Sequence, residues 1–474
     1  MRACVQKLGL LLLAAGLLLG MPMTASAHVK TDYILDASGT EIRIPVSYTF
    51  RQVMQEFSSA GSLKNAQDLF IDAQNHLYVA DTGNHRVLKL DLSGTLLQVY
   101  TGPEDRPMKE PNGVYVDADG DLFVADTGNR RVLHLAPDGA FVEEFGNPES
   151  DILGQDFVFE PQKVYVNKIG YLTVLKRNAF FTMDAGGQFR GYVGATQVDF
   201  DLGRVLIRMF ASETQRERIR KQQAVSYSNF VIDRDGMIYA TVPGANRDQI
   251  MKISSVGTNI YPSGRYGEKS LDADGRLQNP NFTDLAVDAN GIISALDKAN
   301  GKIYQYSQEG DLLAVFGGLG SVKGTFQVPV SIAVDGNGAL YVLDSARNHI
   351  QVMEPTAFIR NVHQASAAYS AGRYDESRQL WEEILQMDET YILAHTGMGN
   401  AFYKEEQWEA AMAEYKLADN AAGYSNAFSA YRHMWFRSHF GWCVAGIAAL
   451  AAGLTGLFLL CRRIADGRPI RRRS

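Results

Sequence analysis

Short runs of alternating apolar and polar residues recur along most of the chain, and they end in Asp or Asn. The runs are rich in β-branched and aromatic residues, which is typical of β-strands. Each run is followed by a tight turn and two further apolar runs. Asp119-Gly120 and Asn337-Gly338 lie in two of these turns and supply the positive φ angles that tight hairpins need. The pattern predicts six units, whose first strands end at Asp72, Asp117, Asn167, Asp233, Asp288 and Asp335.

Two of the units are almost identical in sequence. Residues 66–87 read AQDLFIDAQNHLYVADTGNHRV and residues 111–132 read PNGVYVDADGDLFVADTGNRRV, so that matching positions are 45 residues apart. A fixed period of this size indicates a repeat architecture. One small sheet cannot bury both of its faces, so six units arranged radially predict a mostly β fold, a six-bladed β-propeller over residues 28–360. The alternating segment at about 42–57 is expected to supply the strand that closes the ring.

A motif after the second strand resembles the signature of NHL repeats. It reads Asp-x-x-Asn-x-Arg, and it is complete in the first two units and partial in the last two. The resemblance implies a six-bladed propeller that binds protein, glycan or small-molecule partners. It also implies a minority alternative, a lyase or lactonase with a metal in the central channel. The motif positions are Asp81, Asn84, Arg86, Asp126, Asn129, Arg131, Asp297, Asn300 and Asp344.

These motif residues are interpreted as structural. An Asp at a strand end accepts hydrogen bonds from turn amides, an Asn tolerates the left-handed conformation, and an Arg can reach a neighbouring carboxylate. Residues that recur in every unit are explained by what every unit needs. A function is better sought where the units differ.

One column of residues does differ between the units. It stands four residues before the end of each first strand and comprises Asp68, Gly113, Lys163, Asn229, Asp284 and Ser331. Because the first strands of a propeller are innermost, the column predicts a polar ring at one mouth of the central channel. The ring is either a solvated mouth or a site for a ligand or a metal. Lys163 argues against a strong cation site unless it pairs with Asp68 or Asp284.

No catalytic set emerges from the sequence. The nine His residues show neither an HExxH motif nor clustered ligand spacing. No nucleophile elbow, phosphate loop or dinucleotide fingerprint appears in a supporting context. We therefore expect binding rather than catalysis and no cofactor, with a channel-centred lactonase or lyase holding a divalent cation as the alternative.

An insert at about 197–224 stretches the spacing between units three and four. Residues 204–223 have a helical composition with an apolar front and a basic rear, which includes Arg204, Arg208, Arg216 and Arg220. Inserts in repeat arrays lie on one face and often contact partners. The insert is expected either to contact an anionic partner surface or to cover one end of the propeller as a lid.

After residue 359 the apolar period changes from two to about 3.6, which predicts helices over residues 361–438. Ala365 and Trp381 are matched 34 residues later by Gly399 and Tyr415. This spacing of small and aromatic residues resembles tetratricopeptide repeats. Two such units are fewer than the three that usually fold alone, so the segment is expected to serve either as a stalk or as a second docking site for a protein.

Both ends of the chain carry targeting patterns. Residues 1–27 combine early basic residues, an apolar run and a small-residue ending, which is typical of a secretory signal peptide. Residues 440–461 predict a transmembrane helix, because 442–461 contain no charged residue. The Arg-rich residues 462–474 predict a cytoplasmic tail, which places the propeller outside.

Charge and cysteine content agree with that arrangement. The chain carries −7, of which the signal contributes +2 and the tail +5, so residues 28–461 carry −14. Such an acidic domain is a poor nucleic-acid binder. The three cysteines are Cys4, Cys443 and Cys461, so the predicted outer domain has no disulfide and no thiol nucleophile.

The sequence thus favours a single-pass membrane protein with an extracytoplasmic binding, scaffold or sensor domain. A protein or glycan partner is expected on the propeller face, and a protein partner is a second expectation for the helices.

Overall fold

The computed structural model describes residues 32–36, 38–148, 150, 153, 157–176, 179–193, 227–233, 236–254, 257–271 and 274–465. Three predicted segments fall outside these residues: the signal peptide, the insert with its four named arginines, and residues 466–474 of the tail. Asp32–Ser474 form one compact unit.

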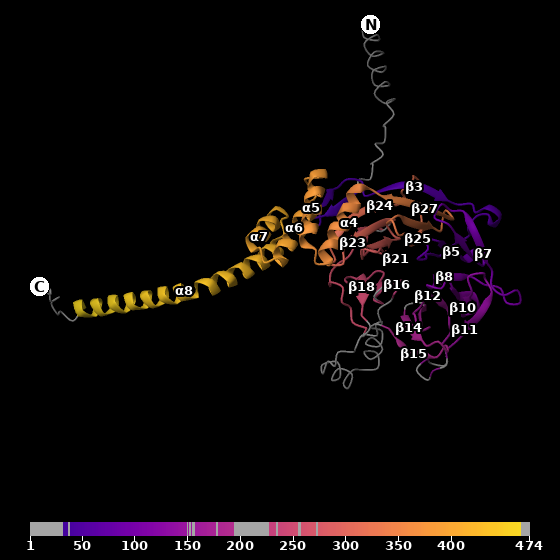
Figure 1. The fold of residues 1–474 in the computed structure, drawn as a ribbon, viewed down its shortest axis with the longest axis horizontal. Helices are drawn as coiled ribbons and strands as arrows, with labels where there is room; N and C mark the ends of the chain where they lie inside the picture. The colour runs from indigo at the N-terminus through magenta and orange to yellow at the C-terminus, as the bar shows by residue number, and fades with distance from the viewer. Residues whose placement is uncertain are drawn as a thin grey trace, which may run out of the picture. The chain divides into compact units, whose positions relative to one another are not determined.

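Six of the seven sheets in the described residues are the blades of a six-bladed β-propeller, as the repeat pattern predicts (Figure 1). In blades one to three the strands are neighbours in chain order, so each blade is an antiparallel meander. Blade one comprises β4 Asp68–Ile71, β5 Leu77–Asp81, β6 Arg86–Leu90 and β7 Leu96–Tyr100; blade two comprises β8 Pro111–Val116, β9 Leu122–Asp126, β10 Arg131–Leu135 and β11 Phe141–Phe145; blade three comprises β12 Pro161–Val166, β13 Leu172–Lys176, β14 Ala179–Met183 and β15 Phe189–Tyr192.

Blades four to six continue the ring with more variation. Among the described residues blade four has three strands, and a short hairpin of β19 Ser270–Leu271 and β20 Leu277–Gln278 follows it in the chain. The strands are β16 Asn229–Ile232, β17 Ile238–Thr241 and β18 Ile250–Ile253 in blade four, β21 Phe282–Val287, β22 Ile293–Asp297, β23 Lys302–Tyr306 and β24 Leu312–Gly317 in blade five, and β25 Pro329–Val334, β26 Leu340–Asp344 and β27 His349–Pro355 in blade six.

The N-terminal strands add to two adjacent blades. β3 (Tyr48–Met54) pairs with β27 and becomes the outer strand of blade six. The segment predicted at about 42–57 is therefore divided, because β2 (Glu41–Arg43) pairs instead with β1 (Tyr33–Leu35). β1 in turn joins the edge of β24, so that blade five becomes a six-stranded sheet. The two additions tie blades five and six to one stretch of chain.

Where the motif is complete, it forms a compact hydrogen-bonded corner after the second strand. In blade two, Asp126 accepts hydrogen bonds from Asn129 Nδ2 at 2.8 Å, Arg131 Nε at 2.7 Å and the Lys109 backbone N at 2.7 Å. The left-handed residue is Arg130 (φ 58°), and not Asn129 as the sequence suggested. The side-chain amide of Asn129 donates to the Asp126 carboxylate, and the next residue, Arg130, adopts the left-handed conformation that the turn requires.

Five helices follow the propeller in the described chain: α4 Ala357–Ser370, α5 Tyr374–Met387, α6 Ile392–Lys404, α7 Trp408–Leu417 and α8 Ala421–Ala465. Thr356 starts the segment, because its hydroxyl accepts from the Ile359 backbone N at 3.4 Å and donates to Val46 O at 2.8 Å. The helices thus begin before the predicted boundary at residue 361, directly after β27.

Helices α4 to α6 share one hydrophobic core with blades five and six. Ile303 and Leu313 of blade five belong to the same buried cluster as Val362 of α4 and Trp381 of α5. The Tyr391 hydroxyl donates to Leu313 O at 2.9 Å. The first helices are therefore an integral part of the propeller's side.

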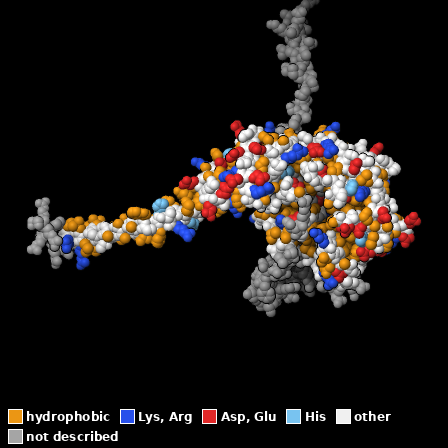
Figure 2. All heavy atoms as spheres, in the orientation of Figure 1, with side chains coloured by type: hydrophobic (Ala, Val, Ile, Leu, Met, Phe, Trp, Pro, Cys, Tyr) orange, Lys and Arg blue, Asp and Glu red, His pale blue; other side chains and the backbone are white. Residues whose placement is uncertain are grey.

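α8 differs from the other helices because its side chains are largely exposed. Ala427 is its one buried residue, and Ile447 and Leu450 are 68% and 67% exposed. Apolar side chains run along this helix (Figure 2). In the described part of the chain it is the one helix long and apolar enough to cross a membrane.

Candidate functional site

The predicted column of polar residues comes together inside the propeller. Each member lies near the start of the innermost strand of its blade, on β4, β8, β12, β16, β21 and β25. Asp68 and Ser331 are 0% exposed, Asp284 is 2% and Asn229 is 5% exposed. The five members with side-chain polar groups, Asp68, Lys163, Asn229, Asp284 and Ser331, are called the polar ring below.

Asp68 links blade one to three other blades. Its Oδ1 pairs with Lys163 Nζ of blade three and accepts a hydrogen bond from the Ser331 hydroxyl of blade six at 3.3 Å. Its Oδ2 accepts from the Val114 backbone N of blade two at 2.9 Å. A carboxylate that would be solvated in an open channel mouth is thus bonded on both of its oxygens.

Asp284 links blade five to the two blades beside it. Its Oδ1 accepts from Asn229 Nδ2 of blade four and from the Leu285 backbone N at 2.8 Å. Its Oδ2 accepts from the Ile332 backbone N of blade six at 2.8 Å. Together the two carboxylates connect all six blades.

Gly113 is the column member with no side chain, and the packing explains why. A Cβ at this position would lie 2.3 Å from Gln162 O and 3.0 Å from Lys163 Cα. Both are backbone atoms of β12, which cannot move aside as a flexible side chain can. The glycine lets blades two and three approach closely, beside the residue that reaches across to Asp68.

Burial sets the charge state of the ring. Burial, with a smaller contribution from the negative charge of Asp68, raises the pKa of Asp284 to about 6 against the opposing charge of Lys163. Burial also raises the pKa of Asp68 against the opposing charge of Lys163. Burial alone would lower the pKa of Lys163, but the two carboxylates outweigh it and raise the pKa. With Asp284 ionised the ring holds two negative charges and one positive charge.

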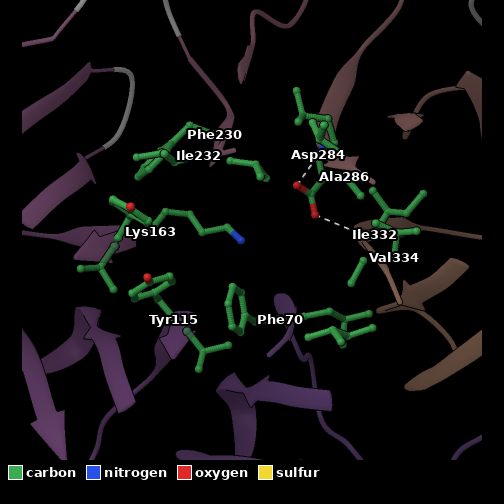
Figure 3. A pocket seen from close by; sticks show the side chains of 18 residues that line it. Phe70, Tyr115, Lys163, Phe230, Ile232, Asp284, Ala286, Ile332 and Val334 are labelled. Atoms are coloured by element: carbon green, nitrogen blue, oxygen red, sulfur yellow. Dashed lines mark hydrogen bonds between the residues drawn. The ribbon is translucent and has the colours of Figure 1, made fainter. Parts of the chain in front are cut away.

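A cavity of about 150 Å³ lies beside the ring. Lys163 Nζ and the Asp284 carboxylate point toward one another across it (Figure 3). No ion pair between described residues joins them, although Lys163 pairs with Asp68. The cavity therefore has one charged group of each sign facing into it.

The sequence analysis missed the walls of this cavity, although a signal was present. Two residues after each column position, blades one to three carry aromatic residues and blades four to six carry aliphatic ones. Neighbouring aromatic rings are 5.3 Å and 4.9 Å apart between centroids. The smaller side chains of blades four to six leave a cavity that six aromatic side chains would fill. The residues at these six positions all line the cavity, and they are Phe70, Tyr115, Tyr165, Val231, Ala286 and Ala333.

The cavity opens toward a second, larger one of about 490 Å³. Both are lined by Ile71, Ile232, Val287 and Val334, and the larger one reaches the acidic strand ends Asp72, Asp233, Asp288 and Asp335. Asp72 Oδ1 accepts from the backbone N of Gln74 and His76, and Asp335 Oδ1 accepts from those of Asn337 and Ala339. Asp72 and Asp335 at the mouth of the larger cavity therefore stabilise their hairpins by accepting hydrogen bonds from turn amides.

Metal binding stays a hypothesis. Within the described residues, no group of three or more His, Cys, Asp and Glu side chains is placed to hold a metal ion. The ring offers Asp68 and Asp284, but Lys163 already neutralises the first. The insert arginines lie outside the described residues, so the structure does not place them against the ring.

Comparison with known proteins agrees with this architecture. The NHL repeat family matches residues 63–90, 108–135 and 326–353, so blades one, two and six carry NHL repeats. Among curated proteins nothing matches.

Similar solved structures include a streptogramin B lyase, with a TM-score of 0.40, 14% identity and coverage of 68% of this chain and 85% of that one. A catalytically inactive virginiamycin B lyase from Staphylococcus aureus with quinupristin gives a TM-score of 0.41, 13% identity and coverage of 68% and 87%. A putative gluconolactonase gives a TM-score of 0.40 and 13% identity, with coverage of 69% of this chain and 98% of that one. At these identities the likeness concerns the fold alone.

Proposed function

We propose that this chain is a single-span membrane protein that holds a ligand-binding propeller on the outer side of a membrane. One observation carries the proposal: α8 continues without a break from the helical segment into residues 442–461, which hold no charge and are not buried against the rest of the described chain. A helix with exposed apolar side chains of this length is stable in lipid and costly in water.

The residues that flank the apolar stretch support an orientation. Trp435, Phe436 and Phe440 precede it, and Arg462 and Arg463 follow it. Aromatic rings favour the membrane–water interface, and basic residues are retained on the cytoplasmic side. The propeller then lies outside, where its acidic surface suits protein, glycan or small-molecule ligands better than nucleic acid.

The shared core supports a role for the helices in presentation. Because α4 to α6 pack into the same cluster as blades five and six, the helical segment cannot swing freely about the propeller. We propose that the helical segment fixes the propeller relative to α8. Docking of a protein on the outer faces of these helices is proposed as a further role.

Protease treatment of intact cells or protoplasts tests this topology. We expect digestion of the propeller and survival of a small membrane-bound C-terminal fragment. A chain that ends at Ser438 should instead be recovered in the soluble fraction. A propeller that stays fully protected while a cytoplasmic control also stays intact would refute the proposed orientation.

A channel-centred lactonase or lyase is the second candidate. The observation in its favour is Asp284, whose pKa of about 6 suits a proton acceptor near neutral pH. Metal analysis of the purified full chain separates the candidates. Stoichiometric divalent metal that is lost in the double variant Asp68→Ala plus Asp284→Ala favours the enzyme, and metal-free protein with an intact fold favours binding.

A further inference from the structure

The facing charges of Lys163 and Asp284 restrict what the channel cavity can accept. The Lys163 ammonium has three N–H donors, and one of them is used by Asp68. The Asp284 carboxylate has about four acceptor positions, and three are used by Asn229, Leu285 and Ile332. The Ser331 hydroxyl also lies beside this carboxylate, but it donates its one proton to Asp68, so the fourth position is open to a ligand. The chemistry of a single hydroxyl group matches this pair, because a hydroxyl oxygen can accept from the Lys163 ammonium while its proton is donated to the Asp284 carboxylate.

We propose that the cavity binds a small uncharged molecule with a six-membered ring, held by one hydroxyl group between Lys163 and Asp284. This inference deepens the proposed function, because it names the ligand class for the propeller's channel.

Charge excludes the other small-molecule classes. A ligand ammonium between the walls would face the Lys163 ammonium, and a ligand carboxylate would face Asp284 with Asp68 close behind it. Either arrangement buries like charges together in a largely apolar space, which is costly. A neutral hydroxyl leaves the existing Asp68–Lys163 pair undisturbed.

The size and walls of the cavity set the rest of the ligand. A cavity of about 150 Å³ is known to accommodate a benzene-sized molecule when it is lined by apolar side chains. Phe70 and Tyr115 provide an aromatic wall on one side, and the small side chain of Ala286 leaves space on the other. A ring can therefore lie against the aromatic wall with further substituents directed toward the larger cavity.

Binding is measured on the full chain in lipid nanodiscs with three probes of matched size. They are trans-1,2-cyclohexanediol, cyclohexylammonium and cyclohexanecarboxylate. Ligand-observed NMR titrations report the affinity of each. We expect saturable binding of the diol, and binding of both charged probes that is about tenfold weaker or undetectable.

Two kinds of variant locate the site. Val334→Phe fills the cavity without altering a charge and should abolish binding of the diol. Any signal that remains with this variant measures uptake of the diol into the lipid and is subtracted. Val99→Phe makes the same change on the outer strand β7, where Val99 is 38% exposed, and should leave binding unchanged. Lys163→Met and Asp284→Asn should each weaken binding about tenfold.

Several results would overturn the inference. They are a charged probe that binds more tightly than the diol, diol binding that survives Val334→Phe, or no binding by any probe to a folded protein. Circular dichroism establishes folding, so a charge variant that unfolds is set aside in favour of Val334→Phe. A chain with the proposed topology that binds no probe contradicts this inference alone, whereas a chain that binds the diol but lies in the cytoplasm contradicts the topology alone.

Discussion

Asp68 and Asp284 show how single side chains hold a ring of repeats together. Each carboxylate accepts hydrogen bonds from blades other than its own, so each connects strands that are far apart in the sequence. Buried charges of this kind are tolerated because each of the four carboxylate oxygens has at least one donor. The same arrangement makes the ring sensitive to small changes in packing and to pH.

Gly113→Ala tests the close approach of blades two and three. The new Cβ would lie 2.3 Å from Gln162 O, so the two strands must separate and the Lys163–Asp68 contact must stretch. We expect a loss of about 1–3 kcal/mol in the free energy of unfolding. Gly146→Ala is the matched control, because nothing lies within 4 Å of the position that its new methyl group would occupy. Equal denaturation midpoints for the two variants would contradict this account.

Asp284→Asn tests the protonation of the ring. The folded pKa of about 6 lies above the ordinary value of 3.8, so the folded state favours the protonated acid. The contribution of this group to stability is full below about pH 4 and is lost as the pH rises through about 6. The wild-type chain should lose up to about 1.4 kcal/mol per pH unit across that window from this group, and the variant should not. Urea denaturation at pH 4, 5, 6 and 7 gives the change in unfolding free energy with pH for the wild-type chain and for the variant. The two slopes should be equal if the pKa of Asp284 has its ordinary value.

At the scale of elements, the seam between α4 and blade five depends on a buried neutral histidine. His363 Nε2 lies 3.0 Å from Gln305 Oε1, while Gln305 Nε2 donates to Tyr48 and Ser294 at 3.0 Å each. Because the Gln305 amide oxygen can only accept, His363 carries its proton on Nε2. Burial lowers the pKa of His363 to about 3.

Acidification should therefore loosen this seam first. The folded pKa lies below the ordinary value of 6.5, so the contribution of His363 is full above about pH 6.5 and is lost as the pH falls toward 3. The hydrogen-exchange protection factors of α4 and α5 amides, compared with those of blade two, should fall between pH 6.5 and 4. His363→Gln has no charge to gain and should remove most of that loss of protection. An unchanged profile in the variant would assign the effect to other groups.

The elements also show what could be predicted from the sequence and what could not. The hairpin pairs and the period of 45 residues identify the blades, and the strand-end spacing identifies the polar column, because both depend on local rules. The pairing of Lys163 with Asp68 is not predictable in that way, since it joins blades one and three across the channel. The division of the N-terminal strands between blades five and six and the shared core with α4 to α6 are also long-range features. The aromatic wall at Phe70, Tyr115 and Tyr165 is predictable from the sequence, because these residues stand at one repeated position, two residues after the polar column.

For the molecule as a whole, the helices divide into a part that completes the propeller and a part that does not. Tyr391 and Trp381 are 0% and 3% exposed within the cluster that contains Ile303 and Leu313, whereas α8 contributes Ala427 to a separate small cluster with Ala411 and Tyr415. The boundary of the folded domain should therefore lie within the helical segment and not at the end of β27.

Two truncations test this boundary. A chain that ends at Pro355 exposes the blade-five and blade-six residues that α4 to α6 cover, so it should aggregate or lose several kcal/mol of stability. A chain that ends at Ser438 keeps that cover and loses the apolar stretch together with the basic tail, so it should be soluble and unfold with the midpoint of the full chain. Size-exclusion chromatography and urea denaturation measure both. A soluble, equally stable chain ending at Pro355 would show that the helices are an independent stalk, and the proposed rigid link between propeller and membrane would then fail with it.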